Sequence, residues 1–350
     1  MKVKLKTFAI LLPLLLASAM VSCSSDDDDT TKLYMSGTLA LSHVPYYMQA
    51  GETLTVRPSG VIHPLGHNVG YYYQVNYTSS STSIVKDTVK YATCSKPYPD
   101  SSFSFTFPDT LANFTITCYA YPNDEEYYST SISSTVATVD SLQSIPALNF
   151  KSIEFHEVDP RDSRDIFYVK IGGRSWMRKN LVYHKMGKPF FECECMRPVF
   201  GSFYTWEEAC KACPAGWHLP SDQEWADMAN AVGGSTSFKP GEDFYGVAGA
   251  LMLPTESRFN VTGELWEFWP DVKITNSTGF CAIPAGYSNN MGGEYDFVGY
   301  TEYACFWTST ASADNSDRAY YRYIYEKEDV LKAGLADKTS FGASVRCIKD

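Results

Sequence analysis

Two close pairs of cysteines have the residue type and spacing of a metal site. Cys193 and Cys195 form the first pair, and Cys210 and Cys213 form the second, about fifteen residues further on. Two such pairs outline a four-thiolate zinc site, because structural zinc is commonly held by four cysteine sulfurs. The usual zinc ribbon has two residues inside each pair, whereas the first pair here has one. The N-terminus has the order of an export signal, basic at 1–6 and apolar at 8–16, so disulfides are the better explanation and we expect no metal.

Cys281 and Cys305 are the candidates for a reactive thiol pair. Catalysis by a thiol needs an exposed and activated thiolate. Both cysteines stand inside apolar runs, at 279–283 and 304–307, which predicts buried positions. They could form a bridge or remain two buried thiols. The six histidines are scattered, so they suggest no catalytic triad and no metal cluster, and we expect no cofactor and no catalytic residue.

Trp266 and Trp269 are the ligand-binding candidates. They lie in a long segment rich in acidic residues, where an exposed indole could stack on a sugar ring. They could equally form the core of that segment. Nearby carboxylates could bind calcium, but solvated loop charges explain them better. These acidic residues are Glu264, Glu267, Asp271, Glu294 and Asp296.

The N-terminus has the layout of an export signal. A basic segment at 1–6 precedes an apolar run at 8–16 and small residues at 17–19. The apolar run is shorter than the ~20 residues that a membrane-spanning helix needs. Residues 20–23 resemble a lipobox, in which the Cys23 thiol is acylated and becomes the new N-terminus. We therefore expect a lipoprotein signal peptide at 1–22.

Residues 23–32 are predicted to be an acidic tether. Four consecutive aspartates at 26–29 repel one another and stay in solvent. An acidic run directly after the lipid cysteine resembles the surface-export signal of Bacteroidetes lipoproteins. We expect a lipid anchor in the outer membrane, with the protein exposed on the cell surface. The formal net charge of -11 argues against nucleic acid as a partner.

Nine cysteines remain after Cys23, and in an exported protein they are expected to form disulfides, with one thiol left over. They are Cys94, Cys118, Cys193, Cys195, Cys210, Cys213, Cys281, Cys305 and Cys347.

Residues 33–139 have a β pattern throughout. Polar and apolar residues alternate over 53–57, 102–107 and 114–120, so one face of each strand is buried. Seven or so short strands suggest an all-β immunoglobulin-like sandwich, which could contain a Cys94–Cys118 bridge. Such a module is most often a spacer or an adhesive unit. Residues 140–165 lose the alternation and are predicted to be a linker.

A short Asp-Ser/Thr-apolar motif occurs four times in the N-terminal half. It resembles the acceptor signal for O-glycosylation of exported Bacteroidetes proteins, and would fit a glycosylated stalk. The acceptors would be Thr30, Thr88, Thr110 and Ser141.

Two helices are predicted after a strand at 166–171. Thr205 with Glu208, and Ser221 with Glu224, have the spacing of capping boxes. On the first helix Trp206, Ala209, Cys210 and Cys213 share one face. Beyond residue 240 the chain returns to short strands and loops, so the second domain is α+β.

Several motifs of residues 166–350 occur together in a fixed order. The most specific is Cys213-Pro-Ala-Gly-Trp-His-Leu-Pro-Ser-Asp-Gln-Glu-Trp225; others are 169–177, Asn180-Leu181, 204–209, 279–286, 306–309 and Ala343-Ser-Val-Arg-Cys347. Together they resemble the Fibrobacter succinogenes major paralogous domain, a family of exported bacterial proteins.

The resemblance implies a C-type lectin-like or formylglycine-generating-like fold, with paired terminal strands, two helices and a long irregular region that carries the ligand surface. It also implies a bridge between Cys213 and Cys347. Cys210 would then bond Cys193 or Cys195. The motif at 306–309 lacks the carboxylates that bind calcium in C-type lectins.

The sequence favours a non-catalytic surface lipoprotein that binds an extracellular glycan or protein through its C-terminal domain. The alternative is a structural adhesin or surface-assembly component. An enzyme of the formylglycine-generating type is a third hypothesis, because those relatives use a cysteine pair for oxidation.

Overall fold

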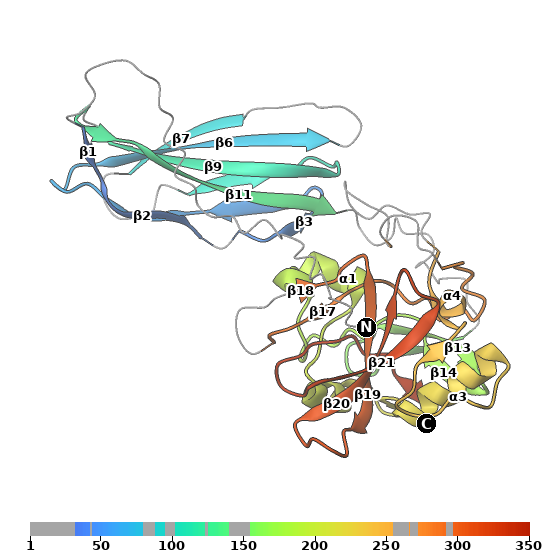
Figure 1. Ribbon diagram of the computed structural model, residues 1–350. Coiled ribbons are helices and arrows are strands. Elements are labelled where there is room, and N and C mark those ends of the chain that lie inside the picture. Colours follow the sequence, from blue (N-terminus) through green and yellow to red (C-terminus); the bar gives the residue numbers. More distant parts are fainter. Residues whose placement is uncertain are drawn as a thin grey trace, which may run out of the picture.

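The computed structural model describes residues 32–42, 44–79, 88–94, 102–122, 125–139, 155–254, 266, 272–291 and 297–350. An N-terminal β-rich region with small sheets is followed by a C-terminal domain of mixed helices and strands (Figure 1). The predicted signal peptide, Cys23 and all of the tether except Lys32 lie outside the described residues.

The N-terminal region is built from one five-stranded sheet, in the order β3-β11-β9-β6-β7, and from the pairs β1-β10, β2-β5 and β4-β8. The runs at 102–107 and 114–120 were expected to be strands, and they lie in β8 and β9. The strands are β1 Leu33–Tyr34, β2 Ser36–Leu41, β3 Tyr47–Gln49, β4 Thr53–Val56, β5 Pro58–Ile62, β6 Val69–Ser79, β7 Thr88–Cys94, β8 Phe103–Thr106, β9 Ala112–Pro122, β10 Tyr127–Tyr128 and β11 Thr130–Val139.

The predicted Cys94–Cys118 bridge is wrong. β6 lies between the two strands that carry these cysteines, with Val69 opposite Cys94 and Tyr73 opposite Cys118. Two strand spacings separate them by ~10 Å, and the four-residue offset adds ~13 Å along the strands. A disulfide requires Cα atoms within about 7 Å. Cys118 is a free thiol in the core, and burial raises its pKa to about 11.

The C-terminal domain contains a five-stranded sheet, β12-β13-β14-β22-β15, and a four-stranded sheet, β16-β21-β20-β19, with β17 and β18 as a separate pair. Gly172 and Gly173 form the turn between β13 and β14, where both have positive φ angles that suit glycine. The strands are β12 His156–Val158, β13 Asp165–Ile171, β14 Arg174–Met177, β15 Trp217–His218, β16 Phe244–Tyr245, β17 Tyr287–Ser288, β18 Phe297–Val298, β19 Tyr303–Ala311, β20 Arg318–Tyr325, β21 Val330–Asp337 and β22 Ile348–Lys349.

Both predicted capping boxes are present, on α2 Trp206–Ala212 and on α3 Asp222–Gly233. In each, the Ser or Thr hydroxyl accepts from the N3 backbone while the N3 glutamate accepts from the cap residue. Gly234 ends α3 in the left-handed conformation. Short helices complete the domain: η3 Phe190–Glu192, η4 Glu194–Met196, α1 Arg197–Phe200 and α4 Ala248–Leu251.

Two expectations about local structure need correction. Cys210 is exposed, because the buried side of α2 is formed by Ala209 and Ala212. The end of the predicted linker is not a linker, since β12 pairs with β13 and extends the five-stranded sheet. A three-residue strand is too short to show periodic alternation, so the sequence pattern did not reveal it.

A buried ion pair joins α3 to the four-stranded sheet. Arg322 of β20 donates through Nε and Nη2 to the two carboxylate oxygens of Asp222, at 2.6 and 2.8 Å, and both side chains are almost fully buried. Arg322 also donates to the Glu242 carbonyl, and its guanidinium lies over the Phe244 ring. The two-point geometry satisfies both charges inside the core.

A disulfide links Cys213, which follows α2, to Cys347, which precedes β22. This confirms the bridge that the family resemblance implies. It joins residues 134 positions apart, and in the chain-entropy model such a loop closure stabilises the folded state by about 4–5 kcal/mol.

The N-terminal region and the C-terminal domain are in contact at β3. The Tyr46 ring lies 4.8 Å from that of Phe191, and Tyr47 packs against Phe190 at 6.0 Å. The Tyr47 backbone N–H donates to Cys193 Sγ at 3.4 Å. This contact closes over Cys193, which is one reason that its thiol is buried.

Candidate functional site

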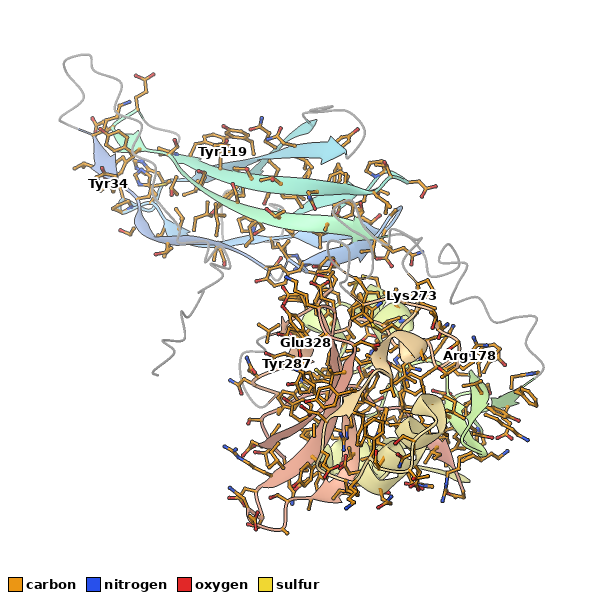
Figure 2. The ribbon with its side chains drawn as sticks, turned by 45° about the vertical axis from the view of Figure 1, so that its right-hand side comes forward. Tyr34, Tyr119, Arg178, Lys273, Tyr287 and Glu328 are labelled. Atoms are coloured by element: carbon orange, nitrogen blue, oxygen red, sulfur yellow. A yellow bond between two sulfur atoms is a disulfide. The ribbon has the colours of Figure 1, made fainter. Side chains whose placement is uncertain are left out.

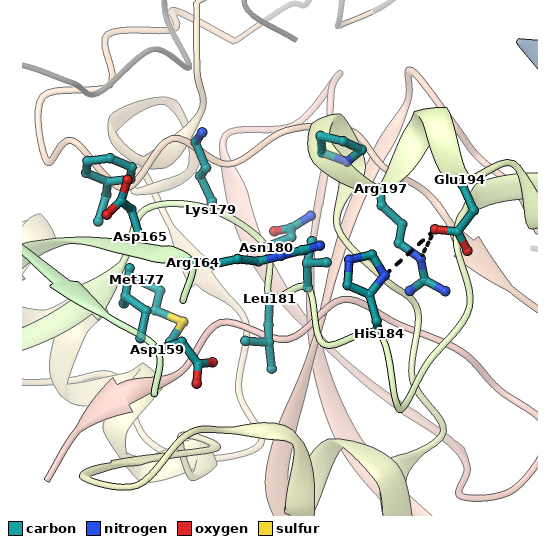
Figure 3. A pocket seen from close by; sticks show the side chains of 14 residues that line it. Asp159, Arg164, Asp165, Met177, Lys179, Asn180, Leu181, His184, Glu194 and Arg197 are labelled. Atoms are coloured by element: carbon teal, nitrogen blue, oxygen red, sulfur yellow. Dashed lines mark hydrogen bonds and ion pairs between the residues drawn. The ribbon is translucent and has the colours of Figure 1, made fainter. Parts of the chain in front are cut away.

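A cavity of about 290 Å³ lies at the beginning of β13, between the end of β14 and the segment that contains η4 (Figure 3). Its walls combine apolar side chains with both signs of charge. The lining residues are Asp159, Arg164, Asp165, Ile166, Phe167, Met177, Lys179, Asn180, Leu181, Val182, His184, Glu194, Arg197 and Pro198.

One wall is the turn at 159–164, which Asp159 and Arg161 hold in place. Arg161 donates to both oxygens of the buried Asp159 carboxylate, donates to the Ala212 carbonyl at 2.7 Å, and lies 4.0 Å from the ring centroid of Tyr183. Burial raises the pKa of Asp159, but the hydrogen bonds from Arg161 outweigh it and hold that pKa below its usual value. The turn is therefore fixed against the domain by an ionised carboxylate.

The floor of the cavity is Asn180, whose side chain is fully committed to the protein. Its amide nitrogen donates to the Phe200 carbonyl at 2.8 Å and to the Ser344 hydroxyl at 3.0 Å. Its oxygen accepts from Arg346 Nε at 2.7 Å. Because its polar side-chain atoms are hydrogen-bonded within the protein, Asn180 shapes the floor, and contacts to a ligand would come from neighbouring residues.

Arg346 supports this floor from inside the core. It is fully buried, and besides Asn180 it donates to the carbonyls of Met177, Phe280 and Cys281. Burial lowers its pKa to about 9. The arginine thus joins three segments that lie far apart in sequence.

The other end of the cavity holds Arg164, Arg197 and His184 beside two carboxylates, with Arg164 paired to Asp162 at 3.6 Å. Arg197 is nearly buried and donates through Nε to Glu194 at 2.8 Å and through Nη1 to the Ser202 hydroxyl at 2.5 Å. His184 lies 3.9 Å from Glu194, and Figure 3 shows Arg164 and Arg197 on either side of it. Burial lowers the pKa of His184, and the positive charges of Arg164 and Arg197 lower it further.

The opposite end combines Asp165 and Lys179 (Figure 3). Phe167 also lines the cavity, with Lys179 Nζ 5.6 Å from its ring centroid. Burial lowers the pKa of Lys179, although Asp165 opposes this shift. None of the lining residues carries a hydroxyl or a thiol, so the cavity wall offers groups for binding and charge recognition rather than a Ser, Thr or Cys nucleophile.

Cys281 lies beneath this region but is covered. Its sulfur is 3.4 Å from Arg178 Nη2 and 3.2 Å from Asn276 Nδ2, and its φ angle of 59° is unusual for a residue with a side chain. The residue is about 1% exposed. Cys305 is buried as well, and burial raises its pKa. Both are free thiols.

Three further disulfide candidates are also unpaired. Cys193, Cys195 and Cys210 are free thiols, so the predicted bond between Cys210 and the first pair is wrong. Cys195 is half-buried, and burial raises its pKa to about 12. In the described part of the chain, no group of three or more His, Cys, Asp or Glu side chains is arranged to hold a metal ion.

Trp266 is removed from the ligand-binding candidates. It is fully buried and its indole N–H donates to the Leu253 carbonyl at 3.1 Å, so it belongs to the core. Trp269 and the acidic residues considered for calcium, Glu264, Glu267, Asp271, Glu294 and Asp296, lie outside the described residues.

The glycosylation candidates are only partly described. Thr88 begins β7, and Thr110 is half-buried between β8 and β9, while Thr30 and Ser141 lie outside the described residues. No helix of the described residues is both long and apolar enough to span a bilayer.

A tyrosine cluster lies on the four-stranded sheet and the neighbouring strand β17, away from the cavity. The half-buried rings of Tyr303 and Tyr325 stack at 4.7 Å, and neighbouring centroids are about 5–6 Å apart. In Figure 2, Tyr287 of this cluster and Arg178, beside the cavity residue Lys179, lie on opposite sides of the domain. The cluster comprises Tyr287, Tyr303, Tyr321, Tyr323 and Tyr325.

Sequence reasoning identified neither the cavity nor the tyrosine cluster. The sequence motifs include none of the four basic lining residues, Arg164, Lys179, His184 and Arg197. These residues come together only when the 159–164 turn and the β13–β14 hairpin pack against the segment of η4 and α1. The available signals were Met177, Asn180 and Leu181, which belong to recognised motifs and line the cavity. The three alternate tyrosines of β20, Tyr321, Tyr323 and Tyr325, could have predicted the aromatic face.

The family model of the Fibrobacter succinogenes major domain matches residues 169–349. The match covers more than half of the 350 residues, and the chain belongs to this family. It starts within β13 and ends at β22, so β12 and the 159–164 turn precede it. No curated protein matches the chain.

Proposed function

We propose that this chain is a non-catalytic surface lipoprotein whose C-terminal domain binds an extracellular glycan or protein. The observation that carries the proposal is the cavity, which is concave and sized for a small ligand group. Its walls combine apolar side chains with charged groups at both ends. Such a combination is typical of binding sites, where apolar surface gives affinity and a few polar groups give orientation.

The location follows from the sequence. The signal-like N-terminus, Cys23 and the aspartates that follow support acylation and display on the outer face of the outer membrane. The β-rich N-terminal region would then be an immunoglobulin-like spacer, and the C-terminal domain would have a C-type lectin-like or formylglycine-generating-like fold. Attachment of radiolabelled palmitate tests the anchor: we expect label on the native chain and none on Cys23→Ser.

A binding screen tests the function. The chain from Ser24 onward is applied to a glycan array and to immobilised extracellular proteins, beside the variant Val182→Trp, which fills the cavity. We expect native binding that Val182→Trp loses and that the surface variant Leu335→Trp keeps. Asp165→Lys, which reverses one charge at the wall, is a second variant if Val182→Trp folds poorly. A native chain that binds nothing on either array would overturn the proposal.

The tyrosine cluster favours a second function, that of an adhesin whose ligand is a protein. Tyrosine gives large contact area at low entropic cost and is enriched in protein interfaces. Under this alternative, replacing Tyr303 and Tyr325 by serine abolishes binding to the protein array while Val182→Trp leaves it intact.

The enzyme hypothesis requires an accessible pair of thiols. Cys281 and Cys305 are both buried, which argues against it. Thiol labelling of the native protein tests this: we expect Cys210 to react first, because it is exposed. Rapid labelling of Cys281 and Cys305 would support the enzyme.

A further inference from the structure

We propose that the cavity binds an acidic saccharide, with its carboxylate between Arg164, His184 and Arg197 and its ring toward Phe167. The inference rests on the proposed function and specifies the ligand class. Nothing in the family match assigns a ligand to this cavity.

The end that holds Arg164, His184 and Arg197 supplies the carboxylate site, and each of its arginines also pairs with one carboxylate of the chain. Arg197 is fixed by Glu194 and Ser202 through Nε and Nη1, and Nη2 has no hydrogen bond to any described residue. The His184 ring likewise has no hydrogen bond to the described chain; its nearest charged partner is Glu194, at 3.9 Å. A guanidinium that is already oriented binds a carboxylate with little loss of side-chain entropy.

The balance of charge at His184 points to an anion. The groups that face its ring are Arg164, Arg197, Glu194 and Asp162. The two arginines affect the pKa of His184 more strongly than the two carboxylates do, and like burial they lower it. A carboxylate bound between them would relieve this repulsion and favour the imidazolium.

The other lining groups favour a sugar over a simple inorganic anion. Asp165 and Glu194 can accept hydrogen bonds from sugar hydroxyls, which are donors that sulfate and fully ionised phosphate lack. Phe167 and the apolar side chains of Met177 and Leu181 offer surface to the carbon face of a ring. The ligand class that fits all three features is a hydroxylated ring with one carboxylate.

Part of this specificity lies outside the family match. Asp159, Arg164 and Asp165 precede residue 169, where the match begins. The turn that carries Arg164 is held to the domain by Arg161, through the Ala212 carbonyl and the Tyr183 ring. Family members with another segment at this place would have a different cavity wall, and therefore a different ligand.

Equilibrium binding to the chain from Ser24 onward tests the inference. The probes are oligosaccharides that end in galacturonate, glucuronate or sialic acid, each beside its methyl ester, which keeps the ring and removes the charge. We expect at least one acid to bind about tenfold or more tightly than its ester. Arg164→Gln removes that difference, whereas Arg318→Gln, an exposed arginine on β20, keeps it.

Protonation of His184 gives a second readout. Because its pKa lies below the ordinary value, lowering the pH from about 7.5 to about 5.5 adds positive charge next to the sugar carboxylate and tightens binding. His184→Gln abolishes this pH dependence but still binds. A merely structural role of His184 would leave the pH dependence in place.

The outcomes separate the two proposals. Equal binding of acid and ester, or binding of a peptide carboxylate with no saccharide bound, overturns the acidic-sugar class but leaves the proposed binding function standing. If none of the six probes binds while the array shows binding to neutral glycans, the acidic-sugar class is also overturned and the proposed binding function stands. A blank on both arrays overturns the proposed function as well.

Discussion

Arg346 carries a positive charge inside the core of the C-terminal domain, where burial of a charge is energetically costly. It is a fully buried cation whose hydrogen-bond partners in the described chain are carbonyl and amide oxygens rather than a carboxylate. The Phe280 ring, 4.6 Å from its guanidinium, adds a favourable contact with the positive charge. Its role is to join the cavity floor at Asn180 to the segment that contains Cys281.

Replacing Arg346 by methionine removes the cation and leaves these buried acceptors without a donor. Each unsatisfied acceptor costs about 1–3 kcal/mol, so we expect the free energy of unfolding to fall by about 3–5 kcal/mol. Urea denaturation measures this as a lower midpoint with an unchanged slope. Arg318→Met, on the surface of β20, should change stability by less than about 0.5 kcal/mol. An Arg346→Met protein as stable as the native one would contradict this role.

His218 gives a pH-dependent contribution to stability. Burial lowers its pKa, but hydrogen bonds to Asp350 and Glu224 outweigh this and raise it above the ordinary value. The bound proton therefore stabilises the folded state fully below about pH 6.5, and this contribution is lost as the pH rises through the raised pKa. Because the side chain is more than one-third exposed, we expect at most ~1 kcal/mol.

The comparison of His218→Gln with the native chain measures this effect. The variant should be less stable than the native protein at about pH 6 and nearly as stable at about pH 9. His156→Gln, at an exposed position on β12, provides the control. A loss that is the same at both pH values would show that His218 acts by packing alone.

Among the elements, α3 depends on both its cap and its buried ion pair. Asp222→Ala leaves the Arg322 charge buried without its partner, and we expect a loss of about 3–5 kcal/mol. The double variant Asp222→Ala with Arg322→Met removes both charges and should recover part of that loss. Urea denaturation of the two singles and the double gives the coupling energy. Strictly additive losses would mean that the ion pair contributes no coupling.

The sequence predicted the elements with local signals and missed those without them. Both capping boxes, the Gly234 end of α3 and the 166–171 strand appear as expected. β12 was missed because three residues show no period. The buried face of α2 was misjudged because Cys210, which is apolar enough to fit the pattern, points to solvent.

The cavity was not predictable in the same way. Arg164, His184 and Arg197 are ordinary charged residues in the sequence, and their proximity depends on how a turn, a hairpin and a short helix pack together. Disulfide connectivity was predictable only where the family resemblance implied it. The possible bridge between Cys94 and Cys118 was wrong because the sequence does not reveal the order of strands in the sheet. That order places β6 between the two cysteines.

For the whole molecule, the Cys213–Cys347 bond ties the end of α2 to the last strand. Removing it in Cys213→Ser/Cys347→Ser should lower the free energy of unfolding by about 4–5 kcal/mol in the chain-entropy model. Urea denaturation with and without reductant measures the loss, and the double variant should be insensitive to reductant. Cys210→Ser is the matched control, since that thiol is exposed and free. Equal stability of the reduced and oxidised native chain would contradict the expected contribution.

The two parts of the molecule meet through β3 and the η3 segment, so the N-terminal region holds the C-terminal domain in a defined contact through Tyr46, Tyr47 and Phe191. Glu194 of η4 lines the cavity next to this contact.

Hydrogen–deuterium exchange of the chain from Ser24 onward, with and without a saturating acidic saccharide from the probe set, locates the ligand most directly. The account predicts that binding slows exchange in peptides that cover 159–167, 178–184 and 194–198, which form the cavity wall. Protection confined to β19 and β20, where the tyrosine cluster lies, would contradict the cavity as the binding site.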